Sequence, residues 1–494
     1  MAAGFALDGI VIDRNSPVSR HQQLYKRLRA LIEARLLPPA MALPSTRVLA
    51  LDLRLGRNTV IAVYDQLSLE GFLSTRPGAP PTVRELSRRG EPALPRRDSS
   101  DCGLSQRGRV MASQPFHHGE PGAIAFHPGL PDVGQFPFNT WSRLLTRRAK
   151  FARSDLFGTY HVTGYPDLRE AIARYLSASR GVLCTPDQVV ITNGAQSAFD
   201  LLARILLDPG DVVWMEEPGY YGAAAALISA GAQLAPLHVT DGQWQMTPPA
   251  GVLPRAIFVT PSCHHPLGLT MSMGQRLDLI RLADRWDAWI IEDDYDSEYR
   301  FQGHPIPALQ GITSGERTVF VGTFAKILFP AMRLGYMVLP RQLLSPVKAA
   351  LSATGHFGPL LTQAALADFV SEGHFVRHLR RTRRLYAQRR ESFFTAFDQF
   401  LGKMMTLCRA DAGIQQVAMF RWPIDDRQVA AAAGAEGINV SPLSMQYRHG
   451  RSKSGLVMGY AAVDEREQLR GFRILAEVIE RFAQPWLLDG SSEN

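Results

Sequence analysis

The chain has 494 residues, of which 46% are hydrophobic and 20% are charged. It is too long for one ordinary domain and too apolar for a disordered chain, so at least two cores are expected. Its formal net charge of +8 is compatible with a polyanionic partner but does not require one. Four widely spaced cysteines exclude a disulfide framework and a paired metal motif. Neither a signal peptide nor an apolar run of about 18 residues is evident, which favours a cytoplasmic protein that does not span a membrane.

The N-terminal region carries the pattern of three short helices. Apolar residues recur on one helical face between residues 18 and 36. A second, shorter helix would begin with Ser45 or Thr46 as its N-cap, and Gly56 marks the break that follows it. A third amphipathic stretch starts at Arg57 and closes at Gly71. Three helices joined by tight turns are typical of a helix-turn-helix domain.

The next segments predict a wing and a linker. Residues 72–83 alternate and turn as a β-hairpin does, although three prolines weaken its second strand: Pro77, Pro80 and Pro81. We therefore expect a winged helix-turn-helix domain over residues 1–83. Residues 84–127 are rich in Arg, Ser, Gly, Pro and Glu without a sustained apolar period, which indicates a linker.

Residues 128–494 predict a single large α/β unit. Short β-rich runs such as QVVIT, DVVWM, RAIFVT, WIIED and TVFVGTF alternate with helical stretches such as SAFDLLARILL. Such alternation predicts a mostly parallel sheet covered by helices. We place the large domain up to about residue 341 and a smaller C-terminal subdomain over 342–494.

A lysine and a cluster of carboxylates occupy the ends of two of these strands. The phrase WIIEDDYDSEYR puts acidic residues directly after a buried strand, where a parallel sheet binds ligands. Lys326 follows another β-rich run in VFVGTFAKILFPAMRLGYMV. A pyridoxal 5′-phosphate (PLP) protein needs such a lysine for a Schiff base and an acid for the pyridine nitrogen.

A phosphate cradle is also present in the sequence. Thr323 and Arg333 flank the lysine and suit a phosphate dianion. The segment VVITNGAQSAF reads as strand, turn and helix, so the amides of Gly194, Ala195 and Gln196 would lie at a helix N-terminus. Each feature alone is commonplace, as a surface lysine, a solvated acidic loop or a helix cap; their order on one α/β scaffold favours PLP.

These motifs give the chain a clear resemblance. Residues from about 128 onward resemble a fold type I aminotransferase domain, and the N-terminal part resembles a GntR-type winged helix. Together they resemble the MocR/GabR family of PLP-dependent transcriptional regulators, on four phrases: EDDYDSEYR, GTFAKILFPAMRLGY, EEPGYYG and LPSTRVLA. The resemblance implies that Lys326 carries the internal aldimine. It also implies that Asp293 pairs with the pyridinium nitrogen, Tyr295 donates to the ring O3′ and Tyr220 stacks on the ring.

Two departures from the family pattern stand out. The family phrase TPSHQYPTG is TPSCHHPLG here, which places His265 at the ring-facing position. Cys263, His264 and His265 are adjacent, but no fourth ligand is evident, so we expect no metal site. Aminotransferases also use an arginine near the C-terminus to hold the substrate carboxylate, and the matching position here is Val457.

The resemblance also implies DNA contacts at the starts of the second and third helices. These positions are Ser45, Arg47, Arg57, Asn58 and Thr59. Arginine can pair with guanine, asparagine can read adenine, and hydroxyls can hold phosphate. Helix caps and surface charges are the alternative interpretation of the same residues. The glycine that relatives have in the turn before LPSTR is missing here, so Pro38 and Pro39 would set that turn differently.

The leading hypothesis is a homodimeric transcriptional regulator, domain-swapped in some relatives, that binds a double-stranded DNA operator. It would sense PLP, or a small amine or amino acid, through Lys326. Two alternatives stay open: a working aminotransferase with a DNA-binding appendage, and a DNA-binding protein whose PLP-like domain is only a dimerisation scaffold. The operator, the effector, the direction of regulation and any residual transamination do not follow from the sequence.

Overall fold

The structure of the protein is a computed structural model. It describes residues 10–76, 79–85, 103–114, 125–151, 154–240, 242–247, 251, 253–303, 306–312, 316–450 and 452–489. The chain divides into two compact units, Met1–Gly103 and Leu104–Asn494, and each is described by itself. Within the described ranges, no helix is both long and apolar enough to cross a bilayer.

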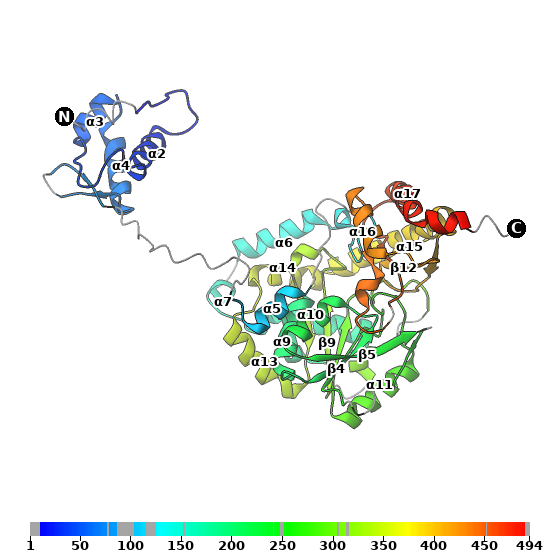
Figure 1. The fold of residues 1–494 in the computed structure, drawn as a ribbon. Coiled ribbons are helices and arrows are strands. Elements are labelled where there is room, and N and C mark those ends of the chain that lie inside the picture. Colours follow the sequence, from blue (N-terminus) through cyan, green and yellow to red (C-terminus); the bar gives the residue numbers. More distant parts are fainter. Residues whose placement is uncertain are drawn as a thin grey trace. The chain divides into compact units, whose positions relative to one another are not determined.

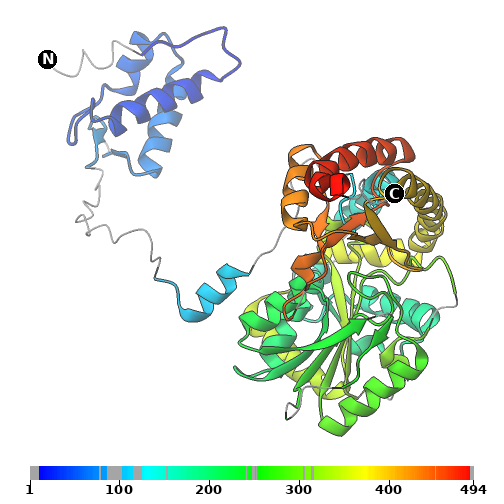
Figure 2. The same cartoon turned by 45° about the vertical axis from the view of Figure 1, so that its right-hand side comes forward.

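The N-terminal unit is a small winged helix-turn-helix. Its helices are α2 (Arg20–Glu33), α3 (Thr46–Asp52) and α4 (Arg57–Leu69), and its strands are β1 (Leu73–Ser74) and β2 (Thr82–Val83) (Figure 2). One face of each helix contributes to a common core, with Leu24 and Leu28 from α2, Leu49 from α3 and Val63 from α4. The alternation of apolar and polar residues in the sequence therefore predicted the core of this unit correctly.

The wing is short, as the prolines predicted. β1 and β2 pair antiparallel over two residues each, with Leu73 opposite Val83. β2 also reaches the turn before α3, where Ala42 bridges to Thr82 and the Ala40 N–H donates to Val83 O at 2.8 Å. The turn and the wing thus stabilise one another.

Ala40 occupies the position in this turn where a glycine would relieve strain. Its φ of +64° lies in the left-handed region, which costs a residue with a Cβ about 1–2 kcal/mol. We expect Ala40→Gly to raise the stability of the N-terminal unit by about 0.5–1 kcal/mol, because relief of strain exceeds the added chain entropy. Hydrogen exchange of the α2 and α4 amides in the full chain measures it. Ala34→Gly is the matched control: Ala34 has a φ of −77°, so the same exchange should lower stability, and equal effects at both positions would contradict the argument.

The second unit is built on an eight-stranded mixed sheet. Its strand order is β3-β10-β9-β8-β7-β4-β5-β6. β10 runs antiparallel to both of its neighbours, β3 and β9, and β6 runs antiparallel to β5. The other neighbouring strands are parallel. The strands are β3 (Val189–Thr192), β4 (Val212–Glu217), β5 (Gln233–Thr240), β6 (Gln243–Trp244), β7 (Ala256–Val259), β8 (Trp289–Asp294), β9 (Thr318–Thr323) and β10 (Gly335–Val338).

Helices cover both faces of this sheet (Figure 1). α9 (Ala195–Leu206), α10 (Tyr221–Ser229) and α13 (Arg341–Thr354) pack on one face, and α11 (Met273–Trp286) and α12 (Leu309–Ile312) on the other. The large domain has four further helices, α6 (Phe138–Lys150), α7 (Ser154–Phe157), α8 (Pro166–Arg180) and α14 (Leu360–Ser371). Short 3₁₀ turns occur at Val133–Gln135, Pro186–Gln188, Pro330–Met332 and Leu443–Gln446.

A smaller antiparallel sheet forms the C-terminal subdomain. Its order is β11-β12-β14-β13, from strands β11 (Met405–Cys408), β12 (Gln415–Phe420), β13 (Ser441–Pro442) and β14 (Gly455–Gly459). Its helices are α15 (His374–Phe400), α16 (Asp426–Ala435) and α17 (Glu465–Asp489). α13 packs on α9, and α14 packs on α6 and α8, so these two helices lie with the large domain and not with the C-terminal subdomain, to which we assigned residues 342–494.

The segment expected as a linker contains a helix. α5 (Gln106–Ser113) is capped by Ser105, whose hydroxyl accepts from the Gly108 N–H at 3.0 Å. α5 packs against α10 of the second unit. None of its residues is buried, because it lies on the surface of that helix. The composition of residues 84–127 gave no sign of this helix, whose stretch has few apolar residues.

Candidate functional site

The three consecutive carboxylates at the end of β8 lie in two different environments. Side chains alternate along a strand, so Glu292 and Asp294 share one side while Asp293 faces the other. Glu292 accepts from the backbone N–H groups of Leu309 and Gln310 at 2.9 and 3.1 Å. Asp294 accepts from Arg180 Nε at 2.7 Å, and both side chains are buried. These two carboxylates therefore have structural partners.

Asp293 differs because it lacks such a partner. It is 4% exposed, and its Oδ1 has no hydrogen-bond partner among the described residues. Burial raises the pKa of Asp293 well above its ordinary value, Asp294 and Glu216 add to the rise, and Lys326 opposes it. A buried carboxylate left open in this way fits a cationic N–H group of a ligand.

Lys326 follows β9 and reaches the same region. Burial lowers the pKa of its ammonium, while Asp296 and Asp293 oppose the lowering. A Cβ built on Gly129 would lie 2.5 Å from Lys326 Nζ, so only a glycine leaves room for the amine at this point. A lysine with a lowered pKa is a better nucleophile at neutral pH.

The register of three strands brings together the residues that we expect to hold a phosphate. In β10, Gly335 pairs with Thr192 of β3 on one side and with Thr323 of β9 on the other. A Cβ on Gly335 would lie 2.9 Å from the Gly194 carbonyl carbon, so the start of α9 lies directly above this row. Gly194, at φ +86°, is the N-cap residue of α9, and the amides of Ala195 and Gln196 begin the helix.

Arg333 and Tyr220 complete this side of the site. Arg333 ends a 3₁₀ turn with φ +51°, two residues before Gly335, and it is exposed. Tyr220 is the N-cap residue of α10, and Gln196 Nε2 donates to Gly222 O at 2.8 Å, which joins the starts of α9 and α10. Burial raises the pKa of the Tyr220 phenol, Asp293 adds to the rise and Arg333 opposes it, so the three side chains lie close enough to interact.

His265 lies between the two aromatic residues of the site. Its ring is 5.1 Å from that of Tyr220 and 5.7 Å from that of Tyr295. Burial lowers the pKa of His265 to about 3, and Lys326 adds to the lowering. The ring is therefore neutral at pH 7. The position that the sequence predicted to face the cofactor ring thus holds an uncharged imidazole.

Of the two residues before His265, Cys263 also lies against Tyr295, whereas His264 points to a different part of the core. Cys263 Sγ lies 3.6 Å from Tyr295 Oη, and burial raises the pKa of the thiol. His264 is fully buried, with its ring 5.4 Å from that of Trp244, and burial lowers its pKa to about 3. The three adjacent side chains therefore do not converge on a common point.

Several residues of the site were missed by sequence reasoning. Gln415 of β12 approaches His265 Nδ1 with its Nε2 at 3.4 Å, and the Gln446 side chain lies beside the same ring. Asp296 accepts from the Ile414 N–H at 2.7 Å, and burial raises the pKa of its carboxyl to about 7. Gly129 was missed as well. Of these residues, only Asp296 could have been found from the sequence, because it lies in the acidic phrase EDDYDSEYR.

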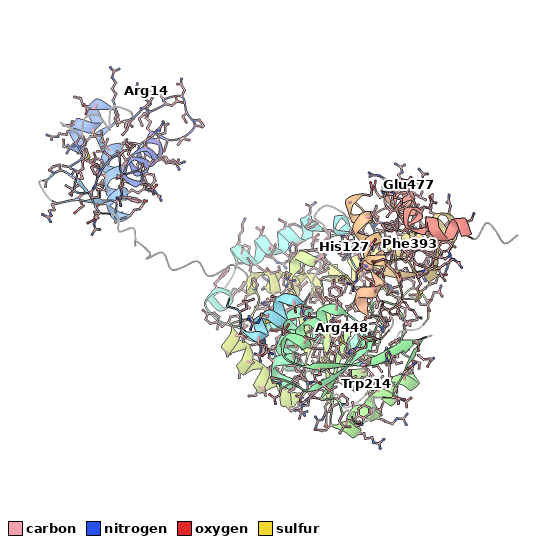
Figure 3. The ribbon with its side chains drawn as sticks, viewed as in Figure 1. Arg14, His127, Trp214, Phe393, Arg448 and Glu477 are labelled. Atoms are coloured by element: carbon pink, nitrogen blue, oxygen red, sulfur yellow. The ribbon has the colours of Figure 1, made fainter. Side chains whose placement is uncertain are left out.

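Val457 has an apolar environment in β14. It is 1% exposed and packs with Val417 and Leu443, and its partners across the two ladders of β14 are Val417 and Ser441. The position predicted to have lost the carboxylate-binding arginine is thus filled by aliphatic packing. Arg448, labelled in Figure 3, precedes this strand in the sequence, and its Nη2 donates to Tyr221 O at 3.4 Å.

The candidate DNA contacts lie on the surface of the N-terminal unit. Ser45, Arg47, Arg57 and Asn58 are exposed, and Thr59 is half-buried. Ser45 also caps α3, because its hydroxyl accepts from the Val48 N–H at 3.4 Å. Arg57 and Asn58 are the first two residues of α4. The N-cap residue of this helix is Gly56, which has no side chain to accept a hydrogen bond.

Comparisons with known proteins agree with this architecture. Residues 132–464 match the family Aminotransferase class I and II. The "Probable rhizopine catabolism regulatory protein MocR" of Rhizobium meliloti is 48% identical over 94% of this chain and 95% of its own. The pyridoxine biosynthesis regulator PdxR of Corynebacterium glutamicum is 28% identical over 95% of this chain and 97% of its own. The multiple substrate aminotransferase of Thermococcus profundus aligns with a TM-score of 0.70 and 23% identity, over 78% of this chain and 100% of its own.

Fold and site together define a winged helix-turn-helix joined to an aminotransferase class I and II domain. The chain belongs to the MocR/GabR-type family of helix-turn-helix transcriptional regulators.

Proposed function

We propose that this regulator holds PLP on Lys326 and changes its affinity for an operator when a small amine enters the same site. The N-terminal unit would bind double-stranded DNA through Ser45, Arg47, Arg57, Asn58 and Thr59. Such a partner places the protein in the cytoplasm with the DNA.

The observation that carries the cofactor assignment is the unpartnered carboxylate of Asp293 beside the buried amine of Lys326. Asp293 would hold the pyridine nitrogen in its protonated form, and Tyr295 and His265 would lie along the ring edge. The α9 amides, Thr323 and Arg333 would hold the phosphate, because a helix N-terminus and a guanidinium both favour a dianion. When bound, PLP supplies an aldehyde that reacts with primary amines.

A homodimer is supported by exposed aromatic residues on one stretch of the second unit. Phe138, Phe151, Phe157 and Tyr160 are between 49% and 79% exposed. Soluble monomers seldom expose several large apolar side chains from one short segment, so this segment is a candidate for contact with a second copy. A dimer would present two recognition helices to two half-sites.

A working aminotransferase is the competing function. Val457, packed among aliphatic side chains, leaves no cation at the position that would hold a substrate carboxylate. We therefore expect amine binding without steady amino-group transfer to a keto acid. Steady turnover with any amino acid would favour the competing function.

The test compares the wild type with Lys326→Ala in the presence of PLP. We expect a visible absorption band in the wild type that Lys326→Ala lacks, and a change of operator affinity on addition of an amine in the wild type only. If both proteins give the same spectrum, the assignment of Lys326 is wrong, and the second unit acts as a scaffold for the DNA-binding unit. DNA binding by both proteins, measured without amine, separates that result from a failure to fold.

A further inference from the structure

We propose that exposed arginines at the start of α15 bind the phosphate backbone of the DNA that flanks the operator. The inference rests on the DNA binding proposed above. It adds a DNA contact on the second unit, outside both the winged helix-turn-helix and the site around Lys326. α15, labelled in Figure 1, packs on α14 and α17 and leaves its other side in solvent.

Five arginines form a basic face in the first half of α15. They point away from the side of the helix that packs on the core, which carries Phe375, His378 and Tyr386. The basic face is roughly 10 Å long, since each residue of a helix adds about 1.5 Å. Its members are all exposed: Arg377, Arg380, Arg381, Arg383 and Arg384.

The stability of α15 does not explain this arrangement. Acidic partners three or four residues away stabilise an arginine on a helix, and like charges at that spacing destabilise the helix. No acidic residue lies three or four positions from any arginine of the basic face, and several of the five have another arginine there. None of the five forms an ion pair within the described part of the chain, whereas the buried Arg389 of the same helix lies 2.9 Å from Asp132.

Exposed arginines on other helices of this protein show the opposite pattern. On α2, α8, α9, α11 and α17, an exposed arginine pairs with an acidic residue three or four positions away. These pairs are Arg29–Glu33, Arg174–Glu170, Arg204–Asp200, Arg281–Asp278 and Arg470–Glu467. The basic face therefore stands out from the other helix surfaces, and a polyanion can supply the charge that it lacks.

Backbone carbonyl groups hold two guanidinium groups of the basic face. Arg381 Nη2 donates to Gln135 O, and Arg383 Nη2 donates to Arg300 O at 3.0 Å. A guanidinium has five N–H donors, so both groups keep donors for a ligand. Because a carbonyl group carries no net charge, these bonds orient the two side chains without neutralising them.

The basic face has the chemistry and the length that DNA requires. A guanidinium can donate two parallel hydrogen bonds to one phosphate. About three phosphates of each strand lie along roughly 10 Å of duplex, so several arginines can be engaged at once. Since both units belong to one chain, a duplex held by the N-terminal unit is at a raised local concentration for α15. Such contacts add affinity but no base recognition.

The test removes two arginines from the basic face and measures DNA binding of the full-length protein over a range of salt concentrations. The double variant carries Arg380→Gln and Arg384→Gln. Neither side chain has a hydrogen-bond or ion-pair partner among the described residues, so the variant should fold. Two duplexes are compared: the sequence that the wild type selects from a random pool, and the same sequence extended on both sides by unrelated DNA.

We expect the double variant to bind the short duplex as the wild type does and the extended duplex at least about tenfold more weakly at low salt. On the extended duplex, the slope of log K against log salt should fall in magnitude by about 2, because each lost phosphate contact removes about 0.9. Arg174→Gln with Arg281→Gln is the matched control. It removes two exposed charges that already pair with acids, so it should keep the wild-type slope.

Three results would overturn the inference: a wild-type slope for the double variant on the extended duplex, an equal loss in the control, or an equal loss on the short duplex. An acidic protein as the true partner of the basic face predicts the first of these. A wild type that selects no sequence from the pool would instead contradict the DNA binding of the whole protein, and this contact with it.

Discussion

Asp294→Asn is expected to lower the free energy of unfolding by about 3 kcal/mol, because it removes the carboxylate that is hydrogen-bonded to the buried Arg180 guanidinium. The Arg180 Nε to Asp294 Oδ2 distance is 2.7 Å, and the two side chains are 7% and 3% exposed. Asn keeps the shape and one acceptor but not the charge. Urea unfolding of the PLP-free full-length protein measures the loss.

Asp293→Asn, one residue earlier, is expected to affect PLP binding and not the stability of the PLP-free protein. The stability of the PLP-free protein should stay the same or rise, since Asp293 has an open oxygen and a pKa raised by burial. Its affinity for PLP should fall by at least about tenfold, because the charge-assisted bond to the pyridine nitrogen is lost. Comparable loss of stability in both variants would contradict the division of roles along β8.

Arg57→Ala is expected to weaken operator binding by about 1–3 kcal/mol per half-site, the range for an arginine that reads a guanine edge. Arg57 opens α4 and is fully available to a ligand, being exposed. The binding assay should use a duplex that the wild type selects from a random pool, at fixed salt, because phosphate contacts depend on salt.

Lys26→Ala is the control for the loss of one positive charge. Lys26 is exposed on α2, away from the helix starts expected to meet the groove. It should change affinity by a small amount that vanishes at higher salt. If Lys26→Ala and Arg57→Ala weaken binding equally, the effect of Arg57 is one of overall charge and not of base recognition.

Much of this architecture could be predicted from local sequence patterns. The buried strands carry runs such as WIIED and TVFVGT, and α9 and α11 carry strong apolar periodicity, so their positions follow from residues close together in the chain. Lys326, Asp293 and Gly194 lie at strand ends or a helix start, which makes their convergence predictable from the parallel sheet.

The rest of the site depends on contacts between distant segments. Gln415 and Gln446 are ordinary polar residues of the C-terminal subdomain, and Gly129 lies nearly 200 residues before Lys326. No local sequence pattern indicates that these residues lie near Lys326 and His265. They are brought there by the packing of the small subdomain against the large sheet. The same reason explains α13 and α14, whose partners α9, α6 and α8 lie far upstream.

The attachment of α5 to α10 sets the reach of the DNA-binding unit. The last strand of the first unit ends at Val83 and Ser105 caps α5, so the chain between them can span at most about 75 Å, whatever its conformation. α10 begins directly after Tyr220, so the helix on which α5 packs starts at a residue of the candidate site.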